Sequence, residues 1–336
     1  MMRKEFIYVV LIALIIGSCN NRDRFDIDLS NIEVNSEIKR LDKDIFEVDL
    51  DNMQEDVNSL VNKYEEFFEL YNSMIVKLGS PYSKAYPEIL KGFVTDFTIN
   101  KIYTKTTEVY ANLDELELEL EEAFKRFKYY FPEKNAPAFY TYIGGFNQSI
   151  VVADSILGIG LDKYLGSDCE FYDRLGLANY LQQNMIPEMI SVDALKSWAL
   201  TEFAYNDSVD NVVNNMIYQG KIQYFLSAIF PSKADSLKYG FSGEEIRWCI
   251  KNENQMWNYL IDQKLLFSTD YMMINKLINP APFTAGFPYE SPGRATIWLG
   301  ERIVSAYMKR YPKVTIKDLM LDDDYRKILS ESRYEP

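Results

Sequence analysis

The sequence predicts a single helix-dominated α+β domain with a small β-sheet. Most apolar residues of the 336-residue chain recur at helical spacing, whereas strand-like composition is confined to short segments between residues 32 and 161. Hydrophobic residues make up 47% of the chain, enough to bury one large core. We see no internal repeat and no interdomain linker. Residues 31–336 are therefore expected to form one domain, preceded by a signal segment (1–18) and a short lipidated tether (19–30).

Composition limits the classes of function that the chain can have. Its 36 Lys and Arg residues face 50 Asp and Glu residues, and the resulting net charge of −14 argues against a nucleic-acid partner. There is no histidine, which excludes histidine-based triads and histidine-ligated metal sites. Three cysteines are too few for a disulfide scaffold or a zinc ribbon. Cys169 and Cys249 either pair in an oxidising compartment or remain buried thiols.

The first 19 residues have the pattern of a bacterial lipoprotein signal peptide. Arg3 and Lys4 precede an apolar run from Phe6 to Ile16, which is too short for a comfortable membrane span. The run ends in Ile-Gly-Ser-Cys, a lipobox, so we expect cleavage before Cys19 and attachment of acyl chains such as palmitate. A plain signal peptide is the alternative. Because the mature chain is acidic, the lipid rather than a basic patch would hold it on the membrane.

Residues 32–132 are expected to hold one strand and four helices. The strand covers 32–41, and three of the helices cover 56–77, about 84–97 and 98–109. The fourth helix opens at Asn112, which has Glu115 at the spacing of a capping box, and it ends at Phe131-Pro132. Acidic residues crowd its first half, and we interpret them as a solvated helix face.

The remaining strands are expected between residues 138 and 161. Residues 138–143 and 149–153 read as two strands joined by a hairpin turn at Gly144-Gly145, and 155–161 is a third candidate. These glycines do not form a phosphate-binding loop, because no lysine is in position and no GxGxxG run leads from a strand into a helix.

A helix pair at residues 186–230 is the centre of the predicted second half. Its first helix places Leu195, Trp198, Glu202 and Tyr205 on one face. Glu202 is then a carboxylate on a face that should be buried. It is either a paired acid or part of a catalytic, metal or binding site.

The last two long helices have identifiable starts. Ser242 and Glu245 have the spacing of a capping box. Ser291 is expected to be an N-cap, with Pro292 as the first helical residue. In this last helix, Gly300 would allow a neighbouring helix to approach closely.

Glu290, Arg294 and Trp298 form the most function-like surface feature. Arg294 and Trp298 lie four residues apart, so a guanidinium could cover the indole. One interpretation is a recognition patch for a partner or a peptide carboxylate. The other is structural, with Arg294 held by an acid such as Glu290 or Glu202. Acidic pairs elsewhere lack the spacing of an EF-hand, and we expect no metal site.

Several segments occur in the order of a known family. They are the lipobox, IEVNSEIKRLDKDIF, FKYYFP, IVVADSILGIGLDKYLG, NNMIYQGKIQYFLSAIFP, IRWCIKNENQMWNYLIDQKLLFS and APF…ESPGRATIWLGERIVSAYM. Together they resemble the gliding-motility lipoprotein GldB family of Bacteroidetes over most of the mature chain. The resemblance implies a lipid-anchored cell-envelope protein that supports gliding motility. It does not imply a biochemical activity.

GldB-type proteins are in turn similar to zinc metallopeptidase-like domains, which pair an HExxH helix with a later EGxAE-like helix. This likeness places Thr201, Glu202 and Tyr205 at the HExxH positions, and it places Gln219 and Gln223 on the second helix. Thr, Tyr and neutral Gln do not replace the imidazole and carboxylate ligands of zinc, so only the general-base position survives. The likeness therefore implies a zincin-like scaffold without its metal, a pseudo-zincin, whose five residues could line a binding groove.

We predict a non-enzymatic, membrane-anchored lipoprotein that faces the periplasm and needs no cofactor. Its partners would be the membrane, through the lipid on Cys19, and envelope proteins of the motility or secretion machinery. Whether the inner or the outer membrane holds it stays open. The alternative is an envelope hydrolase that uses carboxylates, with Glu202 as the general base.

Overall fold

The computed structural model describes residues 24–336 of the chain. The chain divides into an N-terminal unit that ends at Asn31 and a compact unit, Ile32–Pro336, which holds the described helices and strands. The predicted signal segment and Cys19 lie outside the described residues. Within residues 24–336, no helix is long and apolar enough to cross a membrane.

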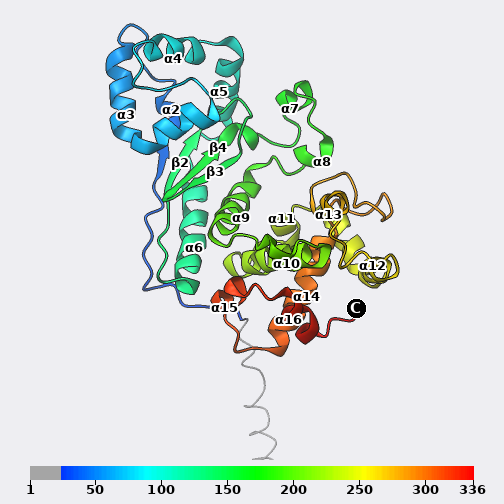
Figure 1. Ribbon diagram of the computed structural model, residues 1–336. Helices are drawn as coiled ribbons and strands as arrows, with labels where there is room; N and C mark the ends of the chain where they lie inside the picture. The colour runs from blue at the N-terminus through cyan, green and yellow to red at the C-terminus, as the bar shows by residue number, and fades with distance from the viewer. Residues whose placement is uncertain (1–23) are drawn as a thin grey trace, which may run out of the picture. The chain divides into compact units, whose positions relative to one another are not determined.

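The compact unit has the predicted α+β class, with many helices and one four-stranded sheet (Figure 1). The strands are β1 (Ile38–Arg40), β2 (Ala138–Tyr142), β3 (Ile150–Ala153) and β4 (Ile156–Gly160), in the order β1-β2-β4-β3. β2 runs parallel to both β1 and β4, and β3 runs antiparallel to β4. The sheet is therefore mixed. The strand predicted at 32–41 is reduced to its last residues.

The hairpin predicted at Gly144-Gly145 is wrong, because β2 and β3 are not neighbours. β4 lies between them, and the hairpin joins β3 to β4 through Asp154 and Ser155. All residues of β4 are buried, and a fully buried strand takes an inner position in a sheet. The turn is made possible by Asp154, which adopts a positive φ of 27°.

A first group of helices follows β1 in the chain. These are α2 (Leu41–Asp44), α3 (Met53–Leu70), the π-helix η1 (Tyr71–Ile75), α4 (Tyr86–Val94), α5 (Phe97–Val109) and α6 (Asp114–Tyr130). The predicted helices are thus confirmed, with shifted ends. The capping box at Asn112 is wrong, because the N-cap position is Leu113 and has no side-chain cap. Burial of the Leu113 side chain, rather than a polar cap, accompanies the start of α6.

Aromatic side chains join α3 to the sheet. The Phe67 ring stacks on Tyr140 of β2, with 4.2 Å between ring centroids. Gly158 in β4 leaves room for the same ring, since a Cβ there would lie 2.8 Å from Phe67. Tyr71 and Tyr142 are also fully buried and extend this aromatic layer.

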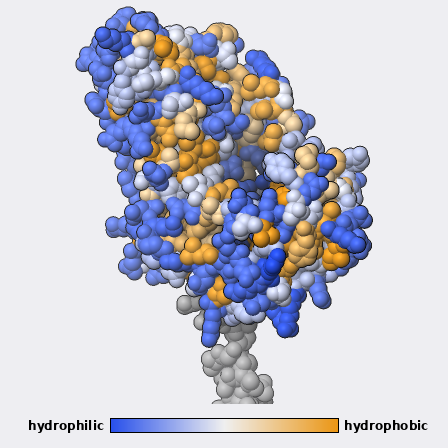
Figure 2. Space-filling model, viewed as in Figure 1, coloured by the Kyte–Doolittle hydropathy of each residue, from blue (hydrophilic) through white to orange (hydrophobic). Residues whose placement is uncertain are grey.

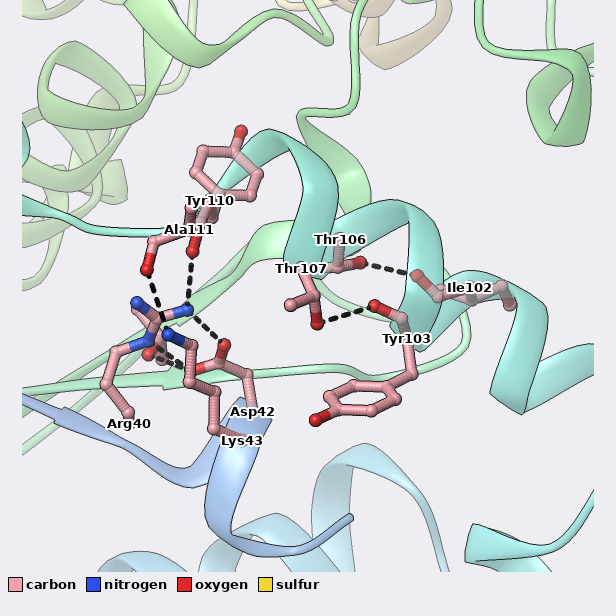
Figure 3. Close-up of polar contacts among 10 residues, drawn as sticks. Arg40, Asp42, Lys43, Ile102, Tyr103, Thr106, Thr107, Tyr110 and Ala111 are labelled. Atoms are coloured by element: carbon pink, nitrogen blue, oxygen red, sulfur yellow. Dashed lines mark hydrogen bonds and ion pairs between the residues drawn. The ribbon is translucent and has the colours of Figure 1, made fainter. Parts of the chain in front are cut away.

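The C-terminal end of α5 is fastened to β1 and α2 by two cationic side chains (Figure 3). Arg40 Nη2 donates to the Tyr110 carbonyl at 3.0 Å and to Asp42 at 2.6 Å. Lys43 Nζ donates to the Ala111 carbonyl at 2.9 Å. Cations are favourable at this end of a helix, because its last carbonyls are unpaired and carry partial negative charge.

The rest of the unit is helical. The elements are η2 (Leu161–Lys163), α7 (Glu170–Arg174), α8 (Asn179–Gln182), η3 (Pro187–Met189), α9 (Ile190–Glu202), η4 (Asp207–Val209), α10 (Val212–Ile229), α11 (Asp235–Tyr239), α12 (Gly243–Asp262), α13 (Tyr271–Ile278), α14 (Thr296–Arg310), α15 (Ile316–Leu321) and α16 (Tyr325–Ser332). The predicted pair at 186–230 corresponds to α9 and α10. The capping box of Ser242 and Glu245 is confirmed at the start of α12. α10 is central and packs against α9, α13, α14, α15 and α16.

α10 and α14 touch backbone to backbone at two glycines. A Cβ on Gly220 would lie 2.3 Å from the carbonyl carbon of Gly300. A Cβ on Gly300 would lie 1.8 Å from the carbonyl oxygen of Met216. Neither contact has room for a side chain, which confirms the close approach predicted at Gly300.

Candidate functional site

The residues predicted at HExxH positions do not share a helix face. α9 ends at Glu202, and Phe203 leaves helical geometry to pack its buried ring 4.9 Å from that of Phe131. Thr201 is exposed at the end of the helix, and its hydroxyl donates to the Ser197 carbonyl. Tyr205 lies beyond the helix. The predicted placement of Thr201 and Tyr205 one helical turn apart is therefore wrong, because burial of Phe203 ends the helix between them.

Glu202 is a paired acid. Its carboxylate accepts a hydrogen bond from Lys134, which lies in the loop after α6, and the Glu202 side chain is 22% exposed. The same ammonium lies 5.8 Å from the centre of the Phe203 ring. Glu202 thus anchors the end of α9 to the loop after α6.

The other predicted groove residues have separate surroundings. Tyr205 donates its hydroxyl proton to Asp210 at 3.1 Å and accepts from Asn215 at 3.0 Å. Gln223 is buried, and its Oε1 has no hydrogen-bond partner in the part of the chain that the structure describes. Gln219 is partly exposed on α10. Within that part of the chain, no hydrogen bond or ion pair joins these residues to Thr201 or Glu202.

The segment before α14 is a folded loop rather than the start of a helix. α14 begins at Thr296, so the N-cap predicted at Ser291 is wrong. Arg294 has a positive φ of 56°, which turns the chain away from helical geometry just before α14. Thr284 holds this turn, since its hydroxyl accepts from the Ala295 N–H and donates to the Pro292 carbonyl, both at 2.7 Å.

Glu290, Arg294 and Trp298 do not form one surface patch. Glu290 is exposed, whereas Trp298 is buried with its ring 5.2 Å from Tyr239. Arg294 Nη2 donates to the Tyr239 carbonyl at 2.9 Å. The predicted lock of Arg294 onto Glu290 or Glu202 is therefore wrong, because the guanidinium turns inward to Tyr239 and Glu202 is held by Lys134.

Arg294 instead lines a polar pocket of about 180 Å³. Three further charged side chains line it: Asp193 and Lys196 from α9 and Glu245 from the first turn of α12. Its walls come from α8, α9, the first turn of α12 and the loops that precede α12 and follow α13. The space-filling view shows a recess near the middle of the visible face (Figure 2). The four charged residues come from three segments far apart in the chain.

The backbone around the pocket leaves little freedom to rearrange. Gly293 packs against Ala281, where an added Cβ would lie 1.9 Å from the carbonyl oxygen. Gly240 has a positive φ of 65°, and its carbonyl accepts from Asn184 at 3.0 Å. These contacts fix the walls that carry Arg294.

Repulsion by Arg294 is the largest influence on the charge of Lys196 in this pocket. The Arg294 charge, together with burial, lowers the pKa of Lys196 to about 7, and Asp193 only partly opposes this. Burial raises the pKa of Asp193, whose carboxylate accepts from the Tyr164 hydroxyl at 3.0 Å. Within residues 24–336, Lys196 has no hydrogen-bond or ion-pair partner.

Sequence reasoning singled out Arg294 and missed the pocket around it. Asp193 and Lys196 stand three residues apart among the buried apolar residues of α9. Two charges on one turn of a helix with apolar neighbours were the available signal. Their proximity to Arg294 results from tertiary packing, which local sequence patterns do not predict.

The residues that could hold a metal are dispersed. Within residues 24–336, no three Cys, Asp or Glu residues converge on a possible metal position. Cys169 and Cys249 are separate buried thiols and do not form a disulfide in this structure. Burial raises the pKa of the Cys249 thiol to about 12.

The fold and the pocket define a helix-dominated α+β protein with a small mixed sheet and a pocket lined by charged side chains. The family model of the gliding motility protein GldB matches residues 22–336, and the chain belongs to this family. The predicted resemblance is thereby confirmed, and membership identifies a gliding-motility-related envelope protein. No curated protein and no solved structure matches the chain. The more distant zincin likeness therefore stays a prediction.

Proposed function

We propose that this protein is a lipid-anchored envelope protein that acts by binding partner proteins of the motility or secretion machinery, without catalysis. Membership of the GldB family is the observation that carries the proposal. The lipobox ending at Cys19 supplies the anchor, and attached acyl chains hold an acidic body at a membrane that repels it. The body would face the periplasm.

The surroundings of Glu202 support a role without catalysis. A general base needs a free carboxylate within reach of the proton that it removes. Glu202 is instead occupied by Lys134, at the end of a helix rather than between two ligand-bearing positions. The sequence also lacks the histidines that an HExxH zinc site requires.

Exposed apolar side chains near α13 offer a surface for a partner. Phe267, Tyr271, Met272 and Tyr289 are each at least 60% exposed. Figure 2 shows apolar side chains among hydrophilic ones over the region of α12 and α13. Large apolar side chains exposed next to each other, as at Tyr271 and Met272, are typical of interaction surfaces.

Removal of the lipidation site tests the anchor. Cys19→Ala should move the protein from the membrane to the soluble fraction of lysed cells, whereas Ser18→Ala keeps a small residue in the lipobox and should leave it in the membrane. Fractionation followed by immunoblotting measures this. Tight membrane association of Cys19→Ala would contradict lipid anchoring.

Crosslinking in intact cells tests the partner surface. Tyr271→Ser combined with Met272→Ser should reduce the yield of crosslinked envelope proteins, because it removes two exposed apolar contacts. Met74→Ser combined with Tyr82→Ser is the matched control, since these residues are similarly exposed on another part of the domain. Equal crosslinking by both double variants would argue against this surface.

A further inference from the structure

The pocket beside α9 brings together two cations that no acid neutralises by direct contact. Within residues 24–336, the Lys196 ammonium has no hydrogen-bond or ion-pair partner, and the only hydrogen bond of the Arg294 guanidinium is the one to the Tyr239 carbonyl. Two positive charges in a partly desolvated site repel each other unless an anion lies between them. The lowered pKa of Lys196 reports this repulsion.

The acids of the pocket restrict what such an anion can be. Asp193 and Glu245 line the same space but form no ion pair with Lys196 or Arg294 among the described residues. A doubly charged phosphate would be repelled by both acids. A singly charged carboxylate, alone or with a neighbouring ammonium group, matches a pocket in which both signs of charge are held apart.

We propose that this pocket binds the carboxylate group of a small amino-acid-like ligand, either a free amino acid or the C-terminal end of a peptide. Arg294 and Lys196 would hold the carboxylate, since a guanidinium binds carboxylates with paired hydrogen bonds. Asp193 would face the amino group of a free amino acid.

The size of the pocket agrees with this class of ligand. A cavity of about 150 Å³ accommodates a benzene molecule. The pocket of about 180 Å³ is therefore suited to a residue between alanine and valine in size. The inference goes beyond the proposed envelope function and is independent of it, because neither Cys19 nor the apolar side chains near α13 line the pocket.

Calorimetric titration of the mature lipoprotein in detergent tests the ligand class with four probes. Alanine or N-acetylalanine should bind, whereas alaninamide, which lacks the carboxylate, and inorganic phosphate should not. Tighter binding of alanine identifies a free amino acid as the source of the carboxylate, and tighter binding of N-acetylalanine identifies a peptide end. The proposal is overturned if neither carboxylate probe binds, or if alaninamide or phosphate binds as tightly.

Substitution of Lys196 tests the site. Lys196→Met should weaken binding of the carboxylate probe about tenfold or more, and Lys196→Arg should retain most of it. Lys251→Met on the exposed side of α12 is the control and should leave binding unchanged. Removal of an unpaired cation should not destabilise the fold, so urea unfolding checks that Lys196→Met remains native. Unchanged affinity in this variant would overturn the assignment.

Proton uptake gives a second readout. Lys196 has a pKa of about 7 beside Arg294, Asp193 and Glu245, so it is largely neutral at about pH 8. A bound carboxylate raises that pKa, and binding at this pH should therefore take up a proton. Titration in buffers of different ionisation enthalpy measures the uptake, which Lys196→Met should abolish. Binding without proton uptake in the unmodified protein would overturn the role of Lys196.

Discussion

The sheet-containing part of the domain buries an anion against backbone N–H groups, whereas the helical part buries a cation against backbone carbonyls. Asp162, just after β4, is fully buried, and its Oδ2 accepts from the N–H groups of Gly144 at 3.2 Å and Phe146 at 2.6 Å. Lys221 in α10 is also buried, and its Nζ donates to the carbonyls of Met320 and Asp322 at the end of α15. Each charge fastens a distant backbone segment.

Lys196 differs from both of these groups because, among the described residues, neither a backbone group nor an acid pairs with it, and it lines the pocket next to Arg294. A buried charge that the backbone satisfies contributes to the fold. A charge that lines a pocket and has no partner does not stabilise the fold in this way, and such charges are typical of functional sites. The comparison therefore separates the groups that we regard as structural from those that we regard as part of a binding site.

The two parts also differ in how tightly their elements pack. Substitutions that test this difference should cause the largest change in the free energy of unfolding. Gly300→Ala forces a Cβ against the Met216 backbone of α10, which cannot move aside. Gly158→Ala meets the ring of Phe67, which can shift. We expect Gly300→Ala to lower the free energy of unfolding by about 3 kcal/mol or more, and Gly158→Ala to lower it by about 1–3 kcal/mol.

Urea denaturation measures both glycine variants. Gly92→Ala in α4 is the control, because nothing lies within 4 Å of its added Cβ, and it should gain about 0.5–1 kcal/mol. Equal losses for Gly300→Ala and Gly158→Ala would show that the α10–α14 contact is no tighter than the contact of α3 with the sheet.

The glycine contact was predictable from sequence, whereas the order of the strands was not. Gly300 interrupts an apolar helical stripe, which is a local signal. The position of β4 between β2 and β3 depends on pairing with Ala138–Tyr142, and no spacing within 150–160 records it. Helix capping shows the same limit: Ser242 caps α12 as predicted, but Ser291 accepts from the Thr284 N–H instead of capping a helix.

The candidate site was predictable only in part for the same reason. Arg294 was identified because it lies four residues before Trp298, but its partner Tyr239 lies 55 residues earlier. Lys196 and Asp193 can be recognised as candidate site residues only from their position beside Arg294 in the folded protein. Glu202 was noticed as an acid on an apolar face, and its partner Lys134 lies in a loop that has no recognisable pattern.

The next largest expected effect is the contribution of Asp162 to the free energy of unfolding, which depends on pH. Burial raises the pKa of Asp162 from its usual 3.8 to about 6, although the N–H groups of Phe146 and Gly144 oppose the shift. The folded state thus binds the proton more tightly than the unfolded state. The resulting stabilisation is present below about pH 4 and is lost as the pH rises through about 6, a change of about 3 kcal/mol.

Asp162→Asn should remove this dependence, since the amide oxygen can still accept from the two N–H groups and no charge is buried. The difference in unfolding free energy between Asp162→Asn and the unmodified protein should shift in favour of the variant as the pH rises from about 4.5 to about 6.5. Urea denaturation at several pH values measures it. Asp262→Asn, an exposed site, should show no such trend. A constant difference for Asp162→Asn would contradict the raised pKa.

The smallest expected effect concerns Glu202, a charge that is neither fully buried nor beside the pocket. Glu202→Gln leaves a hydrogen-bonding group for Lys134 and removes only a partly exposed ion pair, so the free energy of unfolding should change by less than about 1 kcal/mol. The rival hydrolase hypothesis makes a different prediction, because a general base cannot be replaced by an amide. Any hydrolysis of a peptide or glycoside substrate by the purified protein should then disappear in Glu202→Gln while the fold is retained. If hydrolysis is detected and is lost in this variant, the non-catalytic proposal is wrong. Lys134 would then be a residue that adjusts the basicity of a catalytic carboxylate, Glu202, rather than the partner of a structural one.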